Sequence, residues 1–334
     1  MSSPALPPNP PTSSLRVLSY RSPEPGPRVL VLGAVHGNET CGTQAILRIA
    51  AELDGGALEL QRGSLSMVPI TNPLAYRRQQ RNGERNLNRN LYPNPRPQDF
   101  EDRLANVLCP LIAEHDVLLD LHSFQAQGGE PFVMLGPQDN TDPLEPFAHA
   151  AEEQALALRL GPRRIVEGWL QTYAVGVQRR LERTGSGDRA HLLSTDPKYG
   201  VGTTEYMRSQ GGYALTLECG QHQDPAAPEV AYQAILRTLA QVGLLAGATA
   251  PAPSSDVQFL RLSEVTDRLH AEDRFTRPWT SFDTVRAGEA IGIRHDGTQV
   301  KAPADGFVVF PNANSVPGNE WFDFAQTSQR LVGV

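Results

Sequence analysis

The fold is decided by a short stretch, residues 28–39, which reads RVLVLGAVHGNE. Its first eight residues are mostly apolar, as in a buried strand, and the polar residues that follow begin with His36. Two later apolar runs end in a similar way, one in His122 and one in Glu218. Ligands of open α/β sheets bind outside the carboxyl ends of the strands. We therefore expect these polar side chains to meet at one edge of a sheet.

Three of these residues form a candidate metal site. Zinc is bound by imidazole nitrogen and carboxylate oxygen, and a catalytic zinc site keeps one position open. A tight turn at Gly37 can aim His36 and Glu39 at one point, and His122 supplies a third ligand from a second strand end. We predict one zinc ion per chain. Glu218 is then a second carboxylate, which can act as a general base that takes a proton from water and delivers it to the leaving nitrogen.

Asp120 precedes His122 by two residues, so both side chains point to the same face of their strand. Metal-bound histidines usually donate their other ring N–H to a carboxylate or a carbonyl group. We expect Asp120 to be such an acceptor, for His36 rather than for its near neighbour His122. The alternative is an ordinary carboxylate at the end of a strand.

A loop between residues 77 and 89 holds five arginines. No aromatic residues are interleaved with them, and the formal net charge is -7, which argues against nucleic-acid binding. Guanidinium groups bind carboxylates through two hydrogen bonds, so the loop predicts a pocket for a substrate carboxylate. We expect Arg77, Arg78 and Arg85 to be solvated rather than functional.

Length and composition indicate a globular protein. A chain of 334 residues with 40% hydrophobic residues can bury a large core and suggests two domains. The three cysteines have no paired spacing, so neither a disulfide framework nor a thiolate metal site is expected. Residues 1–14 are rich in Pro and Ser and are expected to be a disordered tail. No apolar stretch approaches the length of a membrane span, and we expect a cytoplasmic protein.

The first part of the chain alternates strands with helices. Strands are predicted at 15–20, 28–35, 64–70, 117–121, 132–135 and 213–217, and helices at 40–53, 99–114, 143–157 and 228–245. This alternation is typical of a sheet flanked by helices, and it predicts one α/β domain over residues 15–246. Residues 74–97 are too polar for a core element, and 170–212 show no clear period.

A linker, residues 247–256, separates this domain from a smaller one over residues 257–334. Short strands are predicted there at 284–288, 290–294, 299–302 and 306–311, with turns between them. The pattern resembles the small all-β barrel-sandwich of lipoyl and biotinyl domains. Carrier domains of that type need a modifiable lysine at a hairpin tip. Here the tip reads RHDGT and Lys301 lies beyond it, so we expect the scaffold without the carrier chemistry.

The motifs together resemble one family. They are HGNE at residues 36–39, Asn88-Arg89, Asp120-Leu121-His122 and Leu217-Glu218. Their order and spacing, from about Val29 to Gln221, look like the succinylglutamate desuccinylase/aspartoacylase family, relatives of the zinc carboxypeptidases. The resemblance implies a three-layer αβα domain with a mixed central sheet. It also implies zinc bound by His36, Glu39 and His122, with Glu218 as the base.

Further roles follow from the resemblance. It implies that Arg81 polarises the scissile carbonyl and stabilises the oxyanion. Asn88 and Arg89 would hold a substrate carboxylate, and Arg208 could hold another. One position departs from the family: aspartoacylases place a tyrosine from the β domain against the substrate, whereas no tyrosine follows Tyr232 here and the counterpart region reads NEWF at residues 319–322. The likeness therefore does not extend to specificity for acyl-aspartate.

The leading hypothesis is a zinc-dependent amidohydrolase that cleaves an N-acyl group from an amino acid or a similar small carboxylate. A second hypothesis is a zinc carboxypeptidase, in which Asn88 and Arg89 grip the terminal carboxylate of a peptide. A third is a non-catalytic, zinc-containing binding protein whose β domain engages a partner. We expect a small-molecule substrate, no nucleic-acid or membrane partner, and leave a homo-oligomer open.

Overall fold

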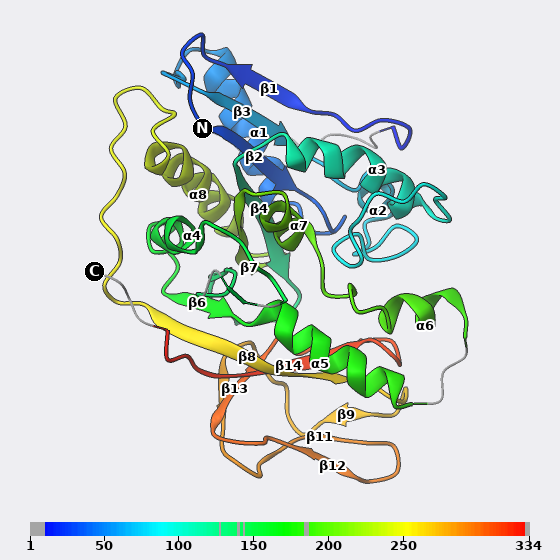
Figure 1. The fold of residues 1–334 in the computed structure, drawn as a ribbon. Coiled ribbons are helices and arrows are strands. Elements are labelled where there is room, and N and C mark those ends of the chain that lie inside the picture. Colours follow the sequence, from blue (N-terminus) through cyan, green and yellow to red (C-terminus); the bar gives the residue numbers. More distant parts are fainter. Residues whose placement is uncertain (1–10, 127, 139–140, 143, 184–186, 331–334) are drawn as a thin grey trace.

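The computed structural model describes residues 11–126, 128–138, 141–142, 144–183 and 187–330. Most of the expected N-terminal tail lies outside these residues. Within them, the main sheet has eleven strands in the order β1-β3-β2-β4-β7-β5-β6-β8-β14-β13-β10 (Figure 1). The strands of its first part are β1 (Leu18–Arg21), β2 (Arg28–Gly33), β3 (Ser64–Val68), β4 (Val117–Phe124), β5 (Phe132–Met134), β6 (Arg164–Glu167) and β7 (Tyr213–Gln221).

The centre of this sheet is parallel. Strand β2 runs parallel to β3 and β4, and β4 runs parallel to β7, whereas β1 and β5 pair antiparallel with β3 and β7. Parallel strands are covered on both faces, which explains why β2, β4 and β7 read as continuous apolar runs. Side chains alternate between the two faces: Val29 and Val31 belong to one core cluster, and Leu30 and Leu32 to another.

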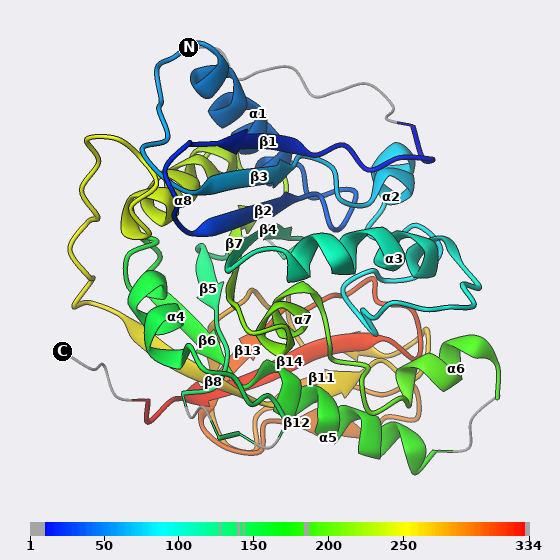
Figure 2. The same ribbon diagram turned by 45° about the horizontal axis from the view of Figure 1, so that its top comes forward.

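Helices cover both faces of the sheet and form the outer two of three layers. On one side lie α1 (Cys41–Asp54), α4 (Ala150–Ala157) and α8 (Ala227–Gln241), which share a core with the Val29 side of β2. On the other lie α3 (Phe100–Ala113) and α7 (Thr203–Ser209). Figure 2 shows α3 and α7 in front of the sheet, with α1 and α8 behind it. The predicted mixed sheet in a three-layer α/β fold is confirmed.

Several short elements were not predicted from the sequence. The polar loop after β3 begins with α2 (Pro73–Arg78), in which the side chain of Asn72 accepts a hydrogen bond from the Ala75 N–H. The unassigned interval contains α5 (Trp169–Leu181), α6 (Arg189–Ser194) and α7. The helix expected from residue 143 begins only at Ala150. These elements are short or lie on the surface, so they lack a long apolar period.

The last part of the chain is all-β. Its strands are β8 (Gln258–Asp267), β9 (Arg274–Phe275), β10 (Asp283–Val285), β11 (Ala290–Ile293), β12 (Gln299–Lys301), β13 (Gly306–Val309) and β14 (Glu320–Thr327). Strands β9, β11 and β12 form a separate small sheet. Lys301 is exposed on β12, beyond the hairpin tip that Arg294 N–H closes on the carbonyl oxygen of Thr298 at 2.8 Å.

The α/β part and the all-β part share the main sheet. The first residues of β8 pair in parallel with β6, and most of β8 pairs antiparallel with β14. Residues 247–256 contain no helix or strand, as expected of a linker. The predicted division into domains at 15–246 and 257–334 stays a prediction, because β8 bridges the two parts. No helix among the described residues combines the length and the apolar character that crossing a bilayer requires.

Candidate active site

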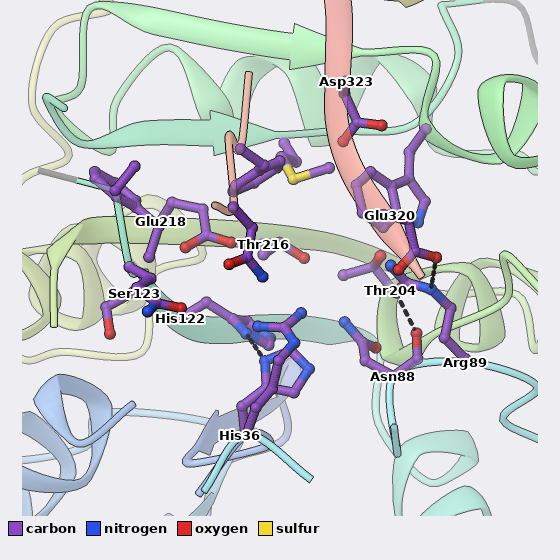
Figure 3. Close-up of a pocket in the computed structure, with 18 of the residues that line it drawn as sticks. His36, Asn88, Arg89, His122, Ser123, Thr204, Thr216, Glu218, Glu320 and Asp323 are labelled. Carbon is purple, nitrogen blue, oxygen red and sulfur yellow. Dashed lines mark hydrogen bonds and ion pairs between the residues drawn. The ribbon is translucent and has the colours of Figure 1, made fainter. Parts of the chain in front are cut away.

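The three predicted strand ends lie side by side. Strands β2, β4 and β7 are consecutive in the sheet, and Gly33 pairs with Leu121 while His122 pairs with Glu218. His36 follows β2 by three residues and turns its ring toward His122 (Figure 3). The polar side chains therefore meet at one sheet edge, as expected. The sequence could predict this because parallel strands end at a common edge.

His36, Glu39 and His122 form a buried group whose donor atoms all lie within 4.8 Å of one another. Nδ1 of His36 lies 2.9 Å from one oxygen of Glu39, and Nδ1 of His122 lies 2.8 Å from the other. The two Nδ1 atoms are 3.1 Å apart. Ligands held tetrahedrally at about 2.0–2.1 Å from zinc are roughly 3.3 Å apart. The donor types and spacings therefore fit a zinc ion after small shifts.

The turn that carries two of these residues depends on a glycine. A Cβ atom at Gly37 would lie 2.0 Å from the carbonyl carbon of Ala75 and 2.1 Å from the nitrogen of Tyr76, which is far inside contact distance. Only glycine lets the turn pass so close to α2. The Glu39 N–H closes the turn on the carbonyl oxygen of His36 at 3.1 Å. Helix α2, which the sequence did not predict, thus fixes where His36 points.

The His36 ring is oriented by Asn86, a residue that sequence analysis missed. Nε2 of His36 lies 3.0 Å from Oδ1 of Asn86, and the same oxygen accepts the backbone N–H of Asn88 at 2.9 Å. Asn commonly accepts from the backbone N–H two residues further on in turns. That local pattern could have marked Asn86 as a structured position, although it does not reveal the partner across the site.

Asp120 contacts His122 rather than His36. Its Oδ2 lies 2.9 Å from Nε2 of His122 and accepts a hydrogen bond from the Thr203 hydroxyl. The expectation that Asp120 would serve His36 is wrong. Alternation along β4 places the Asp120 and His122 side chains on one face, where they contact each other directly, and the opposite side of His36 is already taken by Asn86.

Glu218 is buried and faces the same cavity as the two histidines (Figure 3). Burial raises the pKa of its carboxyl to about 8, assisted by Glu39 and opposed by His122 and Arg81. Its Oε2 atom has no hydrogen-bond partner among the described residues. Burial, together with Arg81, also lowers the pKa of His36 to about 4. Burial lowers the pKa of His122 as well, but Asp120 and Glu39 outweigh it and raise that pKa well above its usual value.

Arg81 lies at the rim of the cavity. Its Nη1 donates to Oε1 of Glu39 at 2.9 Å, and its side chain is about half exposed at 49%. The guanidinium is therefore next to the candidate metal group and accessible to a ligand. Arg77 and Arg78 are exposed, as expected. Arg85 is not: its guanidinium binds the carboxylates of Asp99 and Asp102 at 3.2 and 3.0 Å, and it anchors the loop.

Arg89 is buried deeper in the same cavity. Its guanidinium lies over the rings of Trp169 and Tyr173, 4.9 and 4.5 Å from their centroids, and donates to the Tyr173 hydroxyl at 2.8 Å. Its Nε has no hydrogen-bond partner among the described residues and lies 3.8 Å from Oε1 of Glu320. Asn88 lines the cavity beside it. Nε of Arg89 thus makes no hydrogen bond within the part of the chain that the structure describes, although it is within ion-pair distance of Glu320.

Arg208 borders the cavity, but its guanidinium is already bound. It donates to Glu153 at 2.9 and 3.1 Å, to the carbonyl oxygen of Ala214 at 3.1 Å and to Glu145. Glu205 is a third carboxylate, at 3.4 Å. Three acidic side chains around one buried arginine leave no positive charge for a substrate carboxylate, so we do not carry that role forward.

The cavity, of about 170 Å³, is walled by both parts of the chain. His36, His122 and Glu218 line one region, and Phe310, Glu320, Phe322 and Asp323 from the C-terminal strands line another. The counterpart of the family's tyrosine region therefore reaches the cavity. At this place the chain presents Glu320, whose Oε1 accepts a hydrogen bond from the Tyr199 hydroxyl at 2.5 Å.

Comparison with known proteins identifies the class. Residues 25–241 match a family model described as the succinylglutamate desuccinylase/aspartoacylase catalytic domain. The match spans more than half of the sequence, so the chain belongs to this family, whose members are amide-bond hydrolases. A comparison with curated protein sequences finds no match.

Solved structures of the same family share the fold over nearly the whole chain. A succinylglutamate desuccinylase/aspartoacylase from Rhodobacter sphaeroides matches with a TM-score of 0.67 and 20% identity, covering 95% of this chain and 90% of that one. The product-bound ectoine utilization protein EutE (DoeB) from Ruegeria pomeroyi matches with a TM-score of 0.66 and 20% identity, covering 93% of this chain and 88% of that one. An aspartoacylase family protein from Mesorhizobium loti matches with 0.63 and 20%, covering 95% and 90%. At such identity these likenesses show the fold alone.

Proposed function

We propose that the protein is a zinc-dependent amidohydrolase that removes an N-acyl group from an amino acid or a similar small carboxylate. One observation carries the proposal: the donor atoms of His36, Glu39 and His122 converge within 4.8 Å, in a buried group, and the Glu218 carboxyl lies in the same cavity. Two imidazoles and one carboxylate, with a second carboxylate nearby, suit hydrolysis of an amide by metal and base.

The chain's own residues divide the work. His36, Glu39 and His122 would hold the zinc ion, which when bound polarises the substrate carbonyl and activates water. Glu218 takes a proton from the attacking water on its unpartnered Oε2 and passes it to the leaving nitrogen.

Arginine and asparagine side chains would position the substrate. Arg81, half exposed beside Glu39, is placed to stabilise the negative charge that develops on the carbonyl oxygen. Nε of Arg89 makes no hydrogen bond to the described residues, and Asn88 lies next to it, so these two residues would hold the substrate carboxylate. The cavity is small and is walled on one side by β14, which favours acyl amino acids over longer peptides.

Metal analysis combined with a substrate panel tests the proposal. We expect about one zinc per chain in purified protein, loss of hydrolysis with a chelator, and recovery when zinc is returned. N-acetyl and N-succinyl amino acids should be hydrolysed faster than dipeptides. A preference for dipeptides would favour a carboxypeptidase instead. Zinc bound without turnover of either class would favour a binding protein, and protein with far less than one zinc per chain would remove the proposal.

A further inference from the structure

A second carboxyl group in the cavity is not used by the proposed chemistry. Asp323 lies on β14, opposite Val309 of β13 and Val265 of β8, and only 2% of it is exposed. Its Oδ1 has no hydrogen-bond partner, and no ion pair reaches its carboxyl among the described residues. Asp323 nevertheless lines the cavity that holds the histidines (Figure 3). An acidic side chain is therefore buried at the substrate cavity without a direct ion pair among the described residues, although Arg89 and Arg180 are near enough to act on its pKa.

Neighbouring arginines are committed to other groups. Arg180 binds Asp267 through two hydrogen bonds, at 2.9 and 2.6 Å, and Arg89 binds Tyr173. Burial and then Glu320 raise the pKa of Asp323 well above its usual range, against the opposing effect of Arg89. An ionised carboxylate in such a place is costly unless a cation joins it. A positively charged ligand group would supply what the protein does not.

The surrounding wall suits a cation as well. Trp169, Phe310 and Phe322 line the same cavity as Asp323, and aromatic faces attract ammonium groups. Arg89 Nε makes no hydrogen bond among the residues described and lies 3.8 Å from Oε1 of Glu320, so it offers a donor for a carboxylate in the same space. The unpartnered atoms thus describe a ligand with one negative and one positive group.

We propose that Asp323 binds a free, positively charged amino group of the substrate, so that the preferred substrates are N-acylated diamino acids such as acyl-ornithine or acyl-lysine. This inference rests on the proposed deacylase function. In the reaction, water adds its oxygen to the acyl carbon, the C–N bond breaks, and the released nitrogen takes a proton. The second amino group takes no part and serves only for recognition.

Matched substrates test this role. Nα-acetyl-L-ornithine and Nα-acetyl-L-norvaline share a three-carbon side chain and differ in the terminal ammonium group, and Nα-acetyl-L-glutamate carries the opposite charge. We expect the wild type to prefer the ornithine substrate in kcat/KM. Asp323→Asn should lower that value on the order of 100-fold, as loss of one partner of a buried charge pair does, with the norvaline value changed less than about threefold. Asp323→Glu should keep part of the preference.

Controls separate recognition from damage to the fold. Glu272→Gln removes an exposed carboxylate of the same region. It should leave kcat/KM for the ornithine and the norvaline substrates unchanged. Zinc content and melting temperature of each variant should match the wild type. Succinyl versions of the three substrates repeat the comparison for a different acyl group.

Calorimetric binding of L-ornithine and L-norvaline gives a readout independent of turnover. We expect L-ornithine to bind the wild-type holoenzyme at least tenfold more tightly than L-norvaline, and Asp323→Asn to remove the difference. Equal binding of the two amino acids, or equal loss for all substrates in Asp323→Asn, would overturn the inference while leaving the deacylase proposal intact. Absence of turnover on every acyl amino acid would instead count against the deacylase, and the binding comparison would still decide the role of Asp323.

Discussion

Nε2 of His36 lies 3.0 Å from Oδ1 of Asn86, across a separation of 50 residues in sequence. The contact leaves Nδ1 of His36 to face Glu39 and His122. A loop that lacks helix and strand around residue 86 thereby sets the direction of a candidate metal ligand. The geometry of the site depends on this loop as much as on the strands.

Replacing Asn86 tests that dependence. Asn86→Ala removes the acceptor for the Nε2–H of His36, so the ring loses its fixed orientation and zinc affinity should fall about 10- to 100-fold. Competition with a chromogenic chelator measures the affinity. Asn314→Ala, at an exposed asparagine, is the control and should bind zinc like the wild type. Undiminished affinity in Asn86→Ala would show that the contact does not orient the ligand.

A variant at Glu218 distinguishes a role in proton transfer from a role in metal binding. Glu218→Gln keeps the size of the side chain but cannot accept the proton of the attacking water, so kcat should fall about 10²- to 10⁴-fold. Zinc content should stay at the wild-type value because the proposed ligands are unchanged. Steady-state kinetics and elemental analysis of the same preparation provide both readings. Full activity in this variant would mean that another group is the base.

Glu101 organises the arginine-rich loop from the first turn of α3. Its carboxylate accepts the side-chain amide of Asn72 at 2.9 Å and the backbone N–H groups of Gly83, Glu84 and Arg85 at 3.1 Å. Glu101→Gln places an amide donor among these donors and should lower the free energy of unfolding by about 1–3 kcal/mol.

Chemical denaturation measures that loss. Glu114→Gln, at the exposed C-terminal end of α3, is the matched control and should be close to neutral. Because the loop also carries Arg81 and Asn86, Glu101→Gln should reduce kcat under conditions in which the protein is fully folded. A variant as stable and as active as the wild type would show that the loop is held by other contacts.

The buried carboxylate of Asp273, far from the cavity, should make the stability of the protein sensitive to acid. Burial opposes its ionisation, but Arg294 and the backbone N–H groups of Leu269, His295 and His270 outweigh it and lower the pKa to about 2. Because the folded-state pKa lies below the unfolded one, the stabilisation is fully present above about pH 4 and is lost as the pH falls toward 2. A shift of this size corresponds to about 2 kcal/mol.

Unfolding of Asp273→Asn at several pH values checks whether the stabilisation by Asp273 decreases as the pH falls. The variant should be less stable than the wild type by about 2 kcal/mol at pH 7, and the difference should shrink between pH 4 and pH 3. Asp296→Asn, whose carboxylate is exposed at the nearby hairpin tip, serves as the control. A stability difference that is constant with pH would mean that packing, not ionisation, accounts for the loss.

Sequence patterns predicted the buried parallel strands of the first part of the chain, but not the regular elements β6, β8, β14 and α5. Buried parallel strands are apolar along their whole length, so β2, β4 and β7 were recognisable, and the residues that follow them could be placed at one edge. His36, Glu39, His122 and Glu218 were predicted together for this reason. Their roles as ligands and base remain proposals, whereas their convergence is a property of the fold.

Contacts between segments far apart in the sequence could not be predicted in this way. Asn86 and Asp323 carry no periodic signal, and their importance depends on which side chains the tertiary fold leaves beside them. Arg208 is the opposite case: the resemblance implied a substrate contact, yet Glu145 and Glu153 already bind its guanidinium. Spacing along the chain does not reveal the charges that burial brings near a residue.

Strand β8 belongs to the main sheet through β6 and to the C-terminal strands through β14. A hinge rotation of the C-terminal part would have to break the ladder between β6 and β8, so we expect Phe322 and Asp323 to keep their distance from His36, Glu39 and His122. The wall of the cavity that β14 forms would then limit the length of the substrate. We expect that shortening or lengthening an acyl amino acid by one methylene changes its fit abruptly, because β8 ties the wall formed by β14 to the main sheet.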